Sequence, residues 1–259
     1  RKPRQMKEII GSGKYTFETM LRQSGYRIGF QRRYLASGNA AVFDRVLKMR
    51  QRAHALERDE NGEYEYLREA VASRVVERLR DVDSDRPLKK ILDVGCHTGH
   101  IQRALVSEGL TEDERIELSQ CEACDQVLEA GRQRNAKLNS HFAKTEWFVA
   151  DETQLNKVVE AQSFDVVTSS LALHWVNELP LALLNARYAL KPDGFFVAAL
   201  FGGATLHELQ HCFAAAEEER TGGISPHASP AARLSDMGGL MQMAGFNLIT
   251  IDLDRIIIN

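Results

Sequence analysis

A short glycine-containing segment between two apolar runs constrains this chain more than any other feature of its sequence. The apolar pair 91–92 leads to Asp93, and Gly95 and Gly99 bound the small-residue turn that follows. The amphipathic run 101–110 begins directly after the turn. This order predicts a strand, a tight turn and a helix N-terminus, and glycine lets the backbone of such a turn approach a ligand closely. In doubly wound α/β folds the ligand crevice lies there, outside the carboxyl end of the strand.

Apolar patterns of the strand type and the helix type alternate along most of the chain. Short buried runs such as 164–170 are typical of parallel strands, and apolar residues spaced by four, as in 64–79, are typical of helices. Their alternation predicts an α/β fold with a mostly parallel sheet and helices on both faces. We also expect strands at 116–121, 147–150, 195–201 and 246–258, and helices at 42–52, 127–138, 181–190, 205–219 and 234–244.

Length and composition fit one domain of ordinary size with an appendage. The chain has 259 residues, of which 44% are hydrophobic, enough to bury a sizeable core. No apolar run reaches ~18 residues, so no membrane-spanning helix is expected. Four cysteines give no disulfide framework and indicate a reducing compartment. Cys121-x-x-Cys124 lacks a second pair, so we interpret it as small residues near a strand end, with zinc or redox chemistry as the alternative. No metal site is expected.

Charge is unevenly distributed along the chain. The net charge is −3, but residues 1–35 contain nine Lys and Arg against two acids. We therefore divide the chain into a basic arm (1–36), N-terminal helices (37–87) and a main domain (88–259). A basic arm on an acidic body is typical of partner binding, and its aromatic residues are compatible with contact to ribosomal RNA or with packing on a protein surface. An arginine-rich, acid-poor start is compatible with the remnant of a mitochondrial presequence and with a plain basic extension.

Acidic residues follow two of the expected strands. Glu122 follows the strand 116–121, and in dinucleotide-binding folds a carboxylate at this place accepts hydrogen bonds from a ribose diol. Asp151 and Glu152 follow the strand 147–150, where a carboxylate can accept a hydrogen bond from the exocyclic amine of an adenine ring. The alternative role of Asp151 is to cap a short helix. Together with the glycine turn, these acids predict a nucleoside-containing ligand.

Two sets of motifs resemble known families. The spacing Asp93-x-Gly95-Cys96-x-x-Gly99 with later strand-end acids resembles class I S-adenosylmethionine-dependent methyltransferases. About residues 40 to 259, and most specifically those from 164 onward, resemble the mitochondrial complex I assembly factor five family. That family is methyltransferase-like, and the malonyl-acyl-carrier-protein O-methyltransferase of biotin synthesis is its broader relative. The closer resemblance rests on Phe43-Asp44-Arg45, Ser169-Ser170-Leu171-x-Leu173-His174-Trp175-Val176-Asn177, Leu190-Lys191-Pro192-Asp193-Gly194, Phe201-Gly202-Gly203-x-Thr205-Leu206, Ser225-Pro226-His227 and Ala244-Gly245-Phe246.

This resemblance implies a Rossmann-like fold with a mostly parallel seven-stranded sheet, S-adenosylmethionine as cofactor and a location in the mitochondrial matrix. It also implies protein partners in a large complex during assembly, since the family is credited with hydroxylating an arginine of a complex I subunit. His174 and Trp175 fall where a substrate would bind, with pocket packing as their alternative role. The cofactor positions implied are Asp93, Gly95, Cys96 and Gly99 at the turn, Glu122 at the ribose, Asp151 and Glu152 at the adenine, and Ser169 and Leu171 along the pocket.

Two departures from the family pattern leave a second hypothesis open. His97 replaces the second glycine of the turn; if that position needs a positive φ, the residue is strained and its ring fills the methionine site. The chain also ends at Asn259, where the family continues with a helical segment expected to cover the substrate pocket. The chain is therefore either an enzyme that uses S-adenosylmethionine or a catalytically reduced scaffold that has lost it. Such a scaffold would dock on an assembling complex, either complex I or the mitochondrial ribosome.

Overall fold

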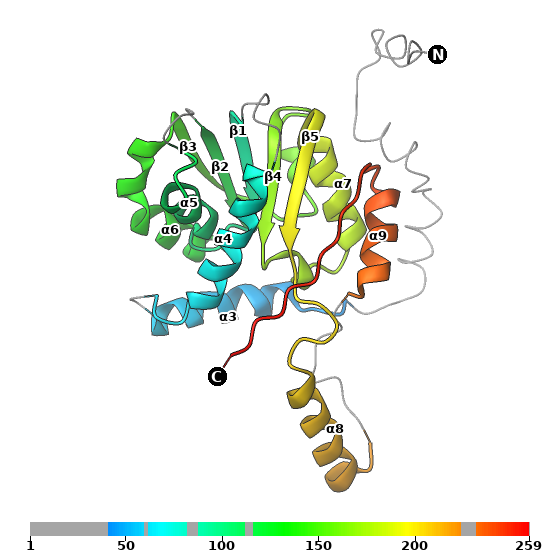
Figure 1. The fold of residues 1–259 in the computed structure, drawn as a ribbon. Helices are drawn as coiled ribbons and strands as arrows, with labels where there is room; N and C mark the ends of the chain where they lie inside the picture. Colours follow the sequence, from blue (N-terminus) through cyan, green and yellow to red (C-terminus); the bar gives the residue numbers. More distant parts are fainter. Residues whose placement is uncertain (1–40, 60–61, 82–87, 112–115, 224–231, 259) are drawn as a thin grey trace, which may run out of the picture.

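A parallel sheet forms the centre of the fold (Figure 1). The computed structural model describes residues 41–59, 62–81, 88–111, 116–223 and 232–258, so the basic arm lies outside the described residues. Five parallel strands pair in the order β3-β2-β1-β4-β5. Because strand order reverses beside β1, the ends of β1 and β4 lie at the switch point of the sheet. The strands are β1 (Lys90–Val94), β2 (Glu117–Glu122), β3 (Lys144–Val149), β4 (Phe164–Ser170) and β5 (Leu190–Ala199).

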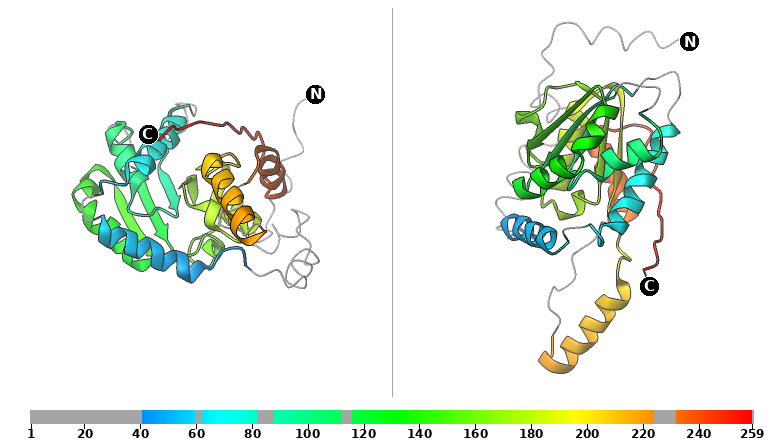
Figure 2. Two further views of the ribbon diagram at one scale, coloured as in Figure 1. Left: turned by 90° about the horizontal axis from the view of Figure 1, so that it is seen from below. Right: turned by 90° about the vertical axis from the view of Figure 1, so that its left-hand side faces the viewer.

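Helices cover both faces of the sheet, as the alternating pattern predicted (Figure 2). Successive residues of a strand point to opposite faces. On one face Ile91 packs in a core with α4 (Tyr66–Arg80) and α5 (His100–Ser107). On the other face Leu92 packs in a core with α7 (Leu179–Ala189). The two buried cores hold the strand ends rigidly, which fixes the positions of the residues that follow them.

The remaining helices of the domain pack around these layers. The helix α6 (Asp125–Arg134) contacts β2 and β3, and α9 (Leu234–Met243) packs on α7. Short 3₁₀ helices occupy Ala136–His141 (η1), Leu155–Lys157 (η2) and Leu173–Trp175 (η3). None of the helices in the described part of the chain combines the length and apolarity that a membrane crossing requires.

One helix lies across the carboxyl ends of the strands. This helix is α3 (Arg45–Arg58), at the lower edge of the sheet in Figure 1. Asp44 caps its N-terminus, where the Asp44 carboxylate accepts a hydrogen bond from the backbone N–H of Leu47 at 2.9 Å. Both α3 and α4 fall within the region 37–87, and α4 packs in the same core as the sheet. Because α3 covers the sheet edge where ligands bind in doubly wound folds, its side chains face the predicted site.

A further helix projects from the body of the domain. The helix α8 (His207–Thr221) extends away from the sheet in Figure 1 and in the right-hand view of Figure 2, and it contains no buried residue. It begins after Gly203, and Leu206 before it adopts a left-handed φ of 53°. The helix expected at 205–219 is thus confirmed, but it contributes nothing to the core.

The expectation of seven strands is wrong, since the sheet of the described residues has five. The segment 246–258, expected as a strand, forms no ladder. It runs past α4 instead, where Asp254 pairs with Arg74 at 3.0 Å and Asp252 pairs with Arg78 at 3.0 Å. Its β-branched residues favour a strand, and the outer edge of β5 has no partner strand among the described residues, yet the segment does not pair there. Side-chain contacts to a helix face prevail here over that preference.

Candidate functional site

The turn between β1 and α5 is tight, as its glycines predicted. The backbone N–H groups of Gly95 and Cys96 both donate to the carbonyl of Cys121 at 2.9 Å. Gly95 has a φ of 69°, and a Cβ there would lie 2.3 Å from the Cβ of Ala172. Gly99 has a φ of 80°, and a Cβ there would lie 2.3 Å from Asn135 Nδ2. Both glycines are therefore required by backbone conformation and by packing within the chain itself.

His97 adopts the left-handed conformation that its position in the turn suggested, with a φ of 52°. A non-glycine residue in this region is strained by about 1–2 kcal/mol. The ring stacks on that of His100 at 5.5 Å between centroids, and its buried Nδ1 has no hydrogen-bond partner among the described residues. Burial and the nearby Arg68 hold the pKa of His97 well below its usual range. The turn thus contains a strained, neutral imidazole.

Glu122, the predicted ribose ligand, is fully buried and paired with α3. Arg52 donates to Glu122 Oε1 at 2.8 Å. The backbone N–H of Cys124 also donates to Oε1 at 3.2 Å, and that of His97 donates to Oε2 at 3.2 Å. A carboxylate has about four acceptor positions, so Arg52 and the two backbone groups leave about one of them open.

Arg45 of α3 binds the acids predicted for the adenine. Its guanidinium lies 3.2 Å from Asp151 Oδ2 and 2.5 Å from Glu152 Oε2. Burial alone would raise the pKa of Asp151, but hydrogen bonds from Thr153 and the charge of Arg45 lower it. Burial raises the pKa of Glu152 against the opposing effect of Arg45, and Glu152 Oε1 has no partner among the described residues. The alternative role of Asp151 as the cap of a short helix is not met, since its carboxylate accepts from Thr153 within a turn and Gln154 is the N-cap residue of η2.

Asp93 is fully buried at the end of β1. Thr168 on β4 donates its hydroxyl to Asp93 Oδ1 at 3.1 Å, while Oδ2 has no hydrogen-bond partner among the described residues. Burial raises the pKa of Asp93 to about 7, with a smaller contribution from the charge of Glu122 and an opposing one from Thr168. Asp93 is therefore close to its ionisation point at neutral pH.

Two residues expected along the pocket are used by the chain itself. Ser169 is fully buried and donates its hydroxyl to the carbonyl of Val94 at 2.8 Å, which ties β4 to β1. Leu171 has a φ of 50° and packs in the core beneath α4 and α5. Cys96 is buried, and burial raises the pKa of its thiol well above the usual range. Contact of these three residues with a cofactor stays a prediction.

The arginines of α3 were missed in reasoning from sequence, although a signal was present. Arg45 and Arg52 are seven residues apart, which places them two turns apart on one face of a helix. A motif rich in buried acids follows this helix in the chain. The spacing of the two basic residues therefore indicates a helix that covers the acids and pairs with them. The structure brings the two arginines to Glu122, Asp151 and Glu152, residues 70 to 107 positions away in the chain.

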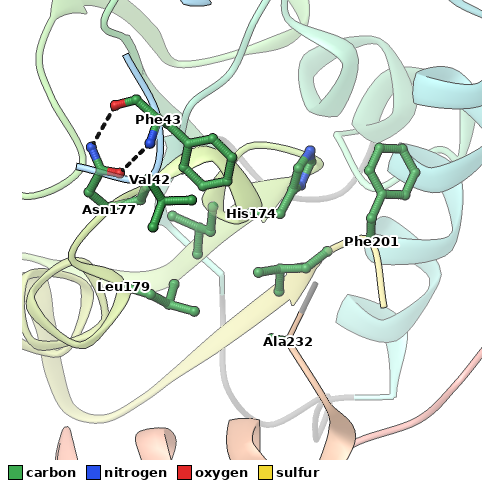
Figure 3. A pocket seen from close by; sticks show the side chains of 10 residues that line it. Val42, Phe43, His174, Asn177, Leu179, Phe201 and Ala232 are labelled. Carbon is green, nitrogen blue, oxygen red and sulfur yellow. Dashed lines mark hydrogen bonds between the residues drawn. The ribbon is translucent and has the colours of Figure 1, made fainter. Parts of the chain in front are cut away.

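A pocket lies beside η3 at the carboxyl edge of β4 and β5 (Figure 3). It encloses about 170 Å³, and none of its lining residues is charged. The Asn177 amide accepts from the backbone N–H of Phe43 at 2.9 Å and donates to the carbonyl of Phe43 at 3.0 Å. The lining residues are Val42, Phe43, Leu173, His174, Val176, Asn177, Leu179, Leu200, Phe201 and Ala232.

His174 lines this pocket, and Trp175 stands beside it. The His174 ring contacts those of Phe201 and Trp175, at centroid distances of 4.7 and 5.0 Å. Both ring nitrogens are buried without a hydrogen-bond partner among the described residues, which costs about 1–3 kcal/mol. Burial lowers the pKa of His174 to about 3, helped by Arg68 and Arg52. The Lys48 ammonium lies 4.1 Å from the centre of the Trp175 ring, so Trp175 faces α3.

One group of side chains in the described part of the chain has the composition of a metal site. One ligand atom each from Glu65, His97 and His100 lie within 4.8 Å of one another. Arg103 and Arg134 already donate to the two oxygens of Glu65, at 2.9 and 3.1 Å. Arg103 also lies 2.7 Å from His100 Nδ1. Because guanidinium groups occupy these atoms and would repel a cation, we assign no metal here. The cluster joins α4, α5 and α6.

The order of strands, the glycine turn and the acids at the ends of β2 and β3 define a class I methyltransferase fold. Two solved structures agree with this fold. The methyltransferase-fold protein BH2331 from Bacillus halodurans has a TM-score of 0.51 at 18% identity, over 68% of this chain and 70% of that one. A chain from the complex of the Haloferax volcanii Trm112 methyltransferase activator with a methyltransferase has a TM-score of 0.52 at 17% identity, over 74% and 73%.

Sequence comparisons confirm the family resemblance. Residues 92–198 match the model of the family described as methyltransferase domain. The chain is 40% identical over 220 residues to the mitochondrial arginine-hydroxylase NDUFAF5 of Homo sapiens, and 39% identical over 218 residues to that of Mus musculus. Each alignment covers 84% of this chain and 59% of the relative, so the chain spans about three fifths of these relatives' length. More distantly, it is 31% identical over 188 residues to the malonyl-[acyl-carrier protein] O-methyltransferase of Xylella fastidiosa, covering 73% of this chain and 58% of that one. The mitochondrial location named for the human and mouse relatives agrees with the location expected from the sequence.

Proposed function

We propose that this chain binds S-adenosylmethionine and acts in the mitochondrial matrix as an assembly factor that modifies a protein subunit of respiratory complex I. One observation carries the cofactor assignment. Glu122 and Asp151 follow adjacent strands on one side of the Gly95–Gly99 turn, where a ribose and an adenine ring would lie. The relatives named as mitochondrial arginine-hydroxylases support an arginine side chain of a protein as the group that is modified.

The residues at this edge fit the proposed cofactor. Glu122 would accept hydrogen bonds from the ribose hydroxyls, and Asp151 would accept one from the adenine amine. Asp93 and Glu152 add buried oxygen atoms without partners among the described residues. When bound, S-adenosylmethionine supplies a sulfonium-activated methyl group. The chain's own part is to bind and orient it, since positioning supplies much of the rate in transfer reactions. Arg52 must release part of Glu122 for two ribose hydroxyls to be accommodated.

Calorimetric titration of the purified chain with S-adenosylmethionine tests this proposal. We expect saturable binding that Glu122→Gln weakens by about 10-fold or more, because a hydrogen bond to a charged acceptor contributes about 1.5–3 kcal/mol. Glu117→Gln is the matched control, since this acid is half exposed at the other end of β2. Absence of binding at millimolar cofactor, or equal weakening by both variants, would contradict the assignment.

His97→Gly is expected to tighten S-adenosylmethionine binding by about fivefold, since removal of the buried ring from the methionine site contributes on the order of 1 kcal/mol. His97→Ala provides the comparison, because it removes the ring and keeps a side chain at positive φ. Both variants should bind more tightly if the ring obstructs the methionine site. Backbone strain at the φ of 52° is present without the cofactor, so its relief should raise the stability to unfolding of the glycine variant alone. If calorimetry shows that both variants bind S-adenosylmethionine more weakly than the unmodified chain, the His97 imidazole contributes to cofactor binding.

The alternative function is a catalytically reduced scaffold, and two observations favour it. His97 fills a glycine position of the turn, and the arginines of α3 already hold the cofactor carboxylates. In this case the basic arm, residues 1–36, would dock the domain on an assembling complex, either complex I or the mitochondrial ribosome with its RNA. Deleting the arm should abolish co-sedimentation with that complex while leaving the thermal unfolding of the domain unchanged. Salt-sensitive binding of ribosomal RNA by the isolated arm would favour the ribosome.

A further inference from the structure

The pocket of Figure 3 is unusual in containing a buried polar ring that nothing in the described chain satisfies. Eight of its ten lining residues are apolar, and the Asn177 amide is used by the backbone of Phe43. Of these two polar side chains, only His174 has ring nitrogens with no hydrogen-bond partner among the described residues, and both nitrogens are buried. A neutral imidazole offers one donor and one acceptor. A ligand that enters the pocket and turns this ring toward itself can thus satisfy one of the two nitrogens within a largely apolar surrounding.

Size and charge restrict what can enter. An apolar cavity of about 150 Å³ holds one benzene molecule, so a pocket of about 170 Å³ accommodates a single six-membered ring. Phe43 and Phe201 lie on either side of His174 and offer aromatic surfaces to such a ring (Figure 3). No acidic or basic residue lines the pocket. A guanidinium or a carboxylate would therefore be desolvated here without a counter-charge, which is unfavourable.

We propose that this pocket binds an uncharged aromatic ring that carries one hydrogen-bonding group, with His174 as the partner of that group. The inference rests on the proposed function, because it names a side chain of the polypeptide substrate that would anchor beside the modified residue. A phenol has the required chemistry, and it can come from a tyrosine side chain or from a free small molecule. The arginine implied by the relatives would lie outside the pocket, because the pocket lining offers it no counter-charge.

Fluorescence of Trp175 provides a direct readout that requires no cofactor. The chain has two tryptophans, so Trp147→Phe leaves Trp175, which contacts the His174 ring. In this background, p-cresol should bind with saturation and at least threefold more tightly than toluene, which has the same ring and no hydroxyl. The anion 4-methylbenzoate and the cation ethylguanidinium should bind more weakly than toluene. N-acetyltyrosinamide should bind at least as well as p-cresol if the natural source is a tyrosine side chain, and more weakly if it is a free phenol.

Two variants locate the binding. Ala232→Phe fills the pocket from one wall and should abolish binding of p-cresol and toluene alike. His174→Phe keeps the aromatic wall and should lower p-cresol affinity to that of toluene, leaving toluene unchanged. Val158→Phe is the control, because Val158 is half exposed at a separate cavity that Trp147 also lines. Should His174→Phe fail to fold by circular dichroism, Ala232→Phe still decides whether the pocket binds a ring.

Three results would overturn the proposal. The first is p-cresol binding by Ala232→Phe that is as tight as in the unmodified pocket. The second is equal affinity of p-cresol and toluene for the unmodified pocket. The third is binding of 4-methylbenzoate or ethylguanidinium that is tighter than that of toluene. None of these measurements depends on S-adenosylmethionine. If calorimetry detects no cofactor binding, the proposed function fails and the ring-binding result still stands. If the cofactor binds and p-cresol does not, only the pocket assignment fails.

Discussion

Replacing Arg52 by methionine is expected to destabilise the fold by about 3–5 kcal/mol, because removal of one partner leaves a buried charge uncompensated. Glu122 is fully buried, and the Arg52 side chain is 12% exposed. Methionine retains most of the apolar stem of arginine, so packing along α3 is largely preserved. Urea unfolding followed by circular dichroism measures the loss as a fall in the transition midpoint.

Two comparisons separate the ion pair from general damage to a helix. Arg132→Met removes an exposed partner of Glu129 on α6 and should cost less than about 1 kcal/mol. The double variant Arg52→Met with Glu122→Gln should recover part of the lost stability, since no unpaired charge remains. If the free energy of unfolding of Arg52→Met lies within about 1 kcal/mol of that of the unmodified protein, the ion pair with Glu122 does not hold α3 on the domain.

The same substitution should act on the cofactor in the opposite direction. With Arg52 present, Glu122 already accepts from one guanidinium and two backbone N–H groups. Removal of the guanidinium opens an acceptor position for the ribose diol, so S-adenosylmethionine should bind more tightly to a less stable protein. Ligand binding would then restore stability as the cofactor concentration rises. A parallel loss of stability and of affinity would indicate instead that Arg52 supports the bound cofactor.

Features governed by local sequence were predicted well. The strand expected at 164–170 has these same limits as β4, because a run of apolar and small residues without charges in its second half is typical of a buried parallel strand. The glycine turn and the strand-end acids were also placed correctly at one edge, since parallel strands share the direction of their carboxyl ends. Once neighbouring strands are known to be parallel, the residue at the carboxyl end of each one is expected at this edge of the sheet.

Features that depend on distant contacts were not predictable in the same way. Arg45 meets Asp151 across 106 positions of chain, and no pattern near either residue identifies the other. The pocket at His174 likewise depends on Phe43, which comes from the start of α3. The segment 246–258 was wrongly expected as a strand because its apolar β-branched composition does not show whether it pairs with a strand or runs along a helix. Tertiary context decides all three.

Asp93→Asn is expected to make the protein more stable, and increasingly so as the pH rises. The ordinary carboxyl pKa of 3.8 is raised to about 7 in the fold, so the folded state binds more protons than the unfolded state between these values. The protonated Asp93 carboxyl therefore contributes its full stabilisation of the fold below about pH 4, and this contribution is lost as the pH approaches 7. Asparagine is neutral throughout and retains an oxygen that can accept from Thr168.

The advantage of the asparagine variant should therefore grow by roughly 3 kcal/mol between pH 5 and pH 8, since each unit of pKa shift corresponds to about 1.4 kcal/mol. Urea midpoints of both proteins at the two pH values measure this difference. Glu152, whose pKa is also raised by burial, is unchanged in both proteins and cancels in the comparison. Carboxyl ¹³C shifts of Asp93 give its titration directly. A stability difference that is constant across this range would show that Asp93 is ionised throughout, and that Oδ2 receives a hydrogen bond in solution.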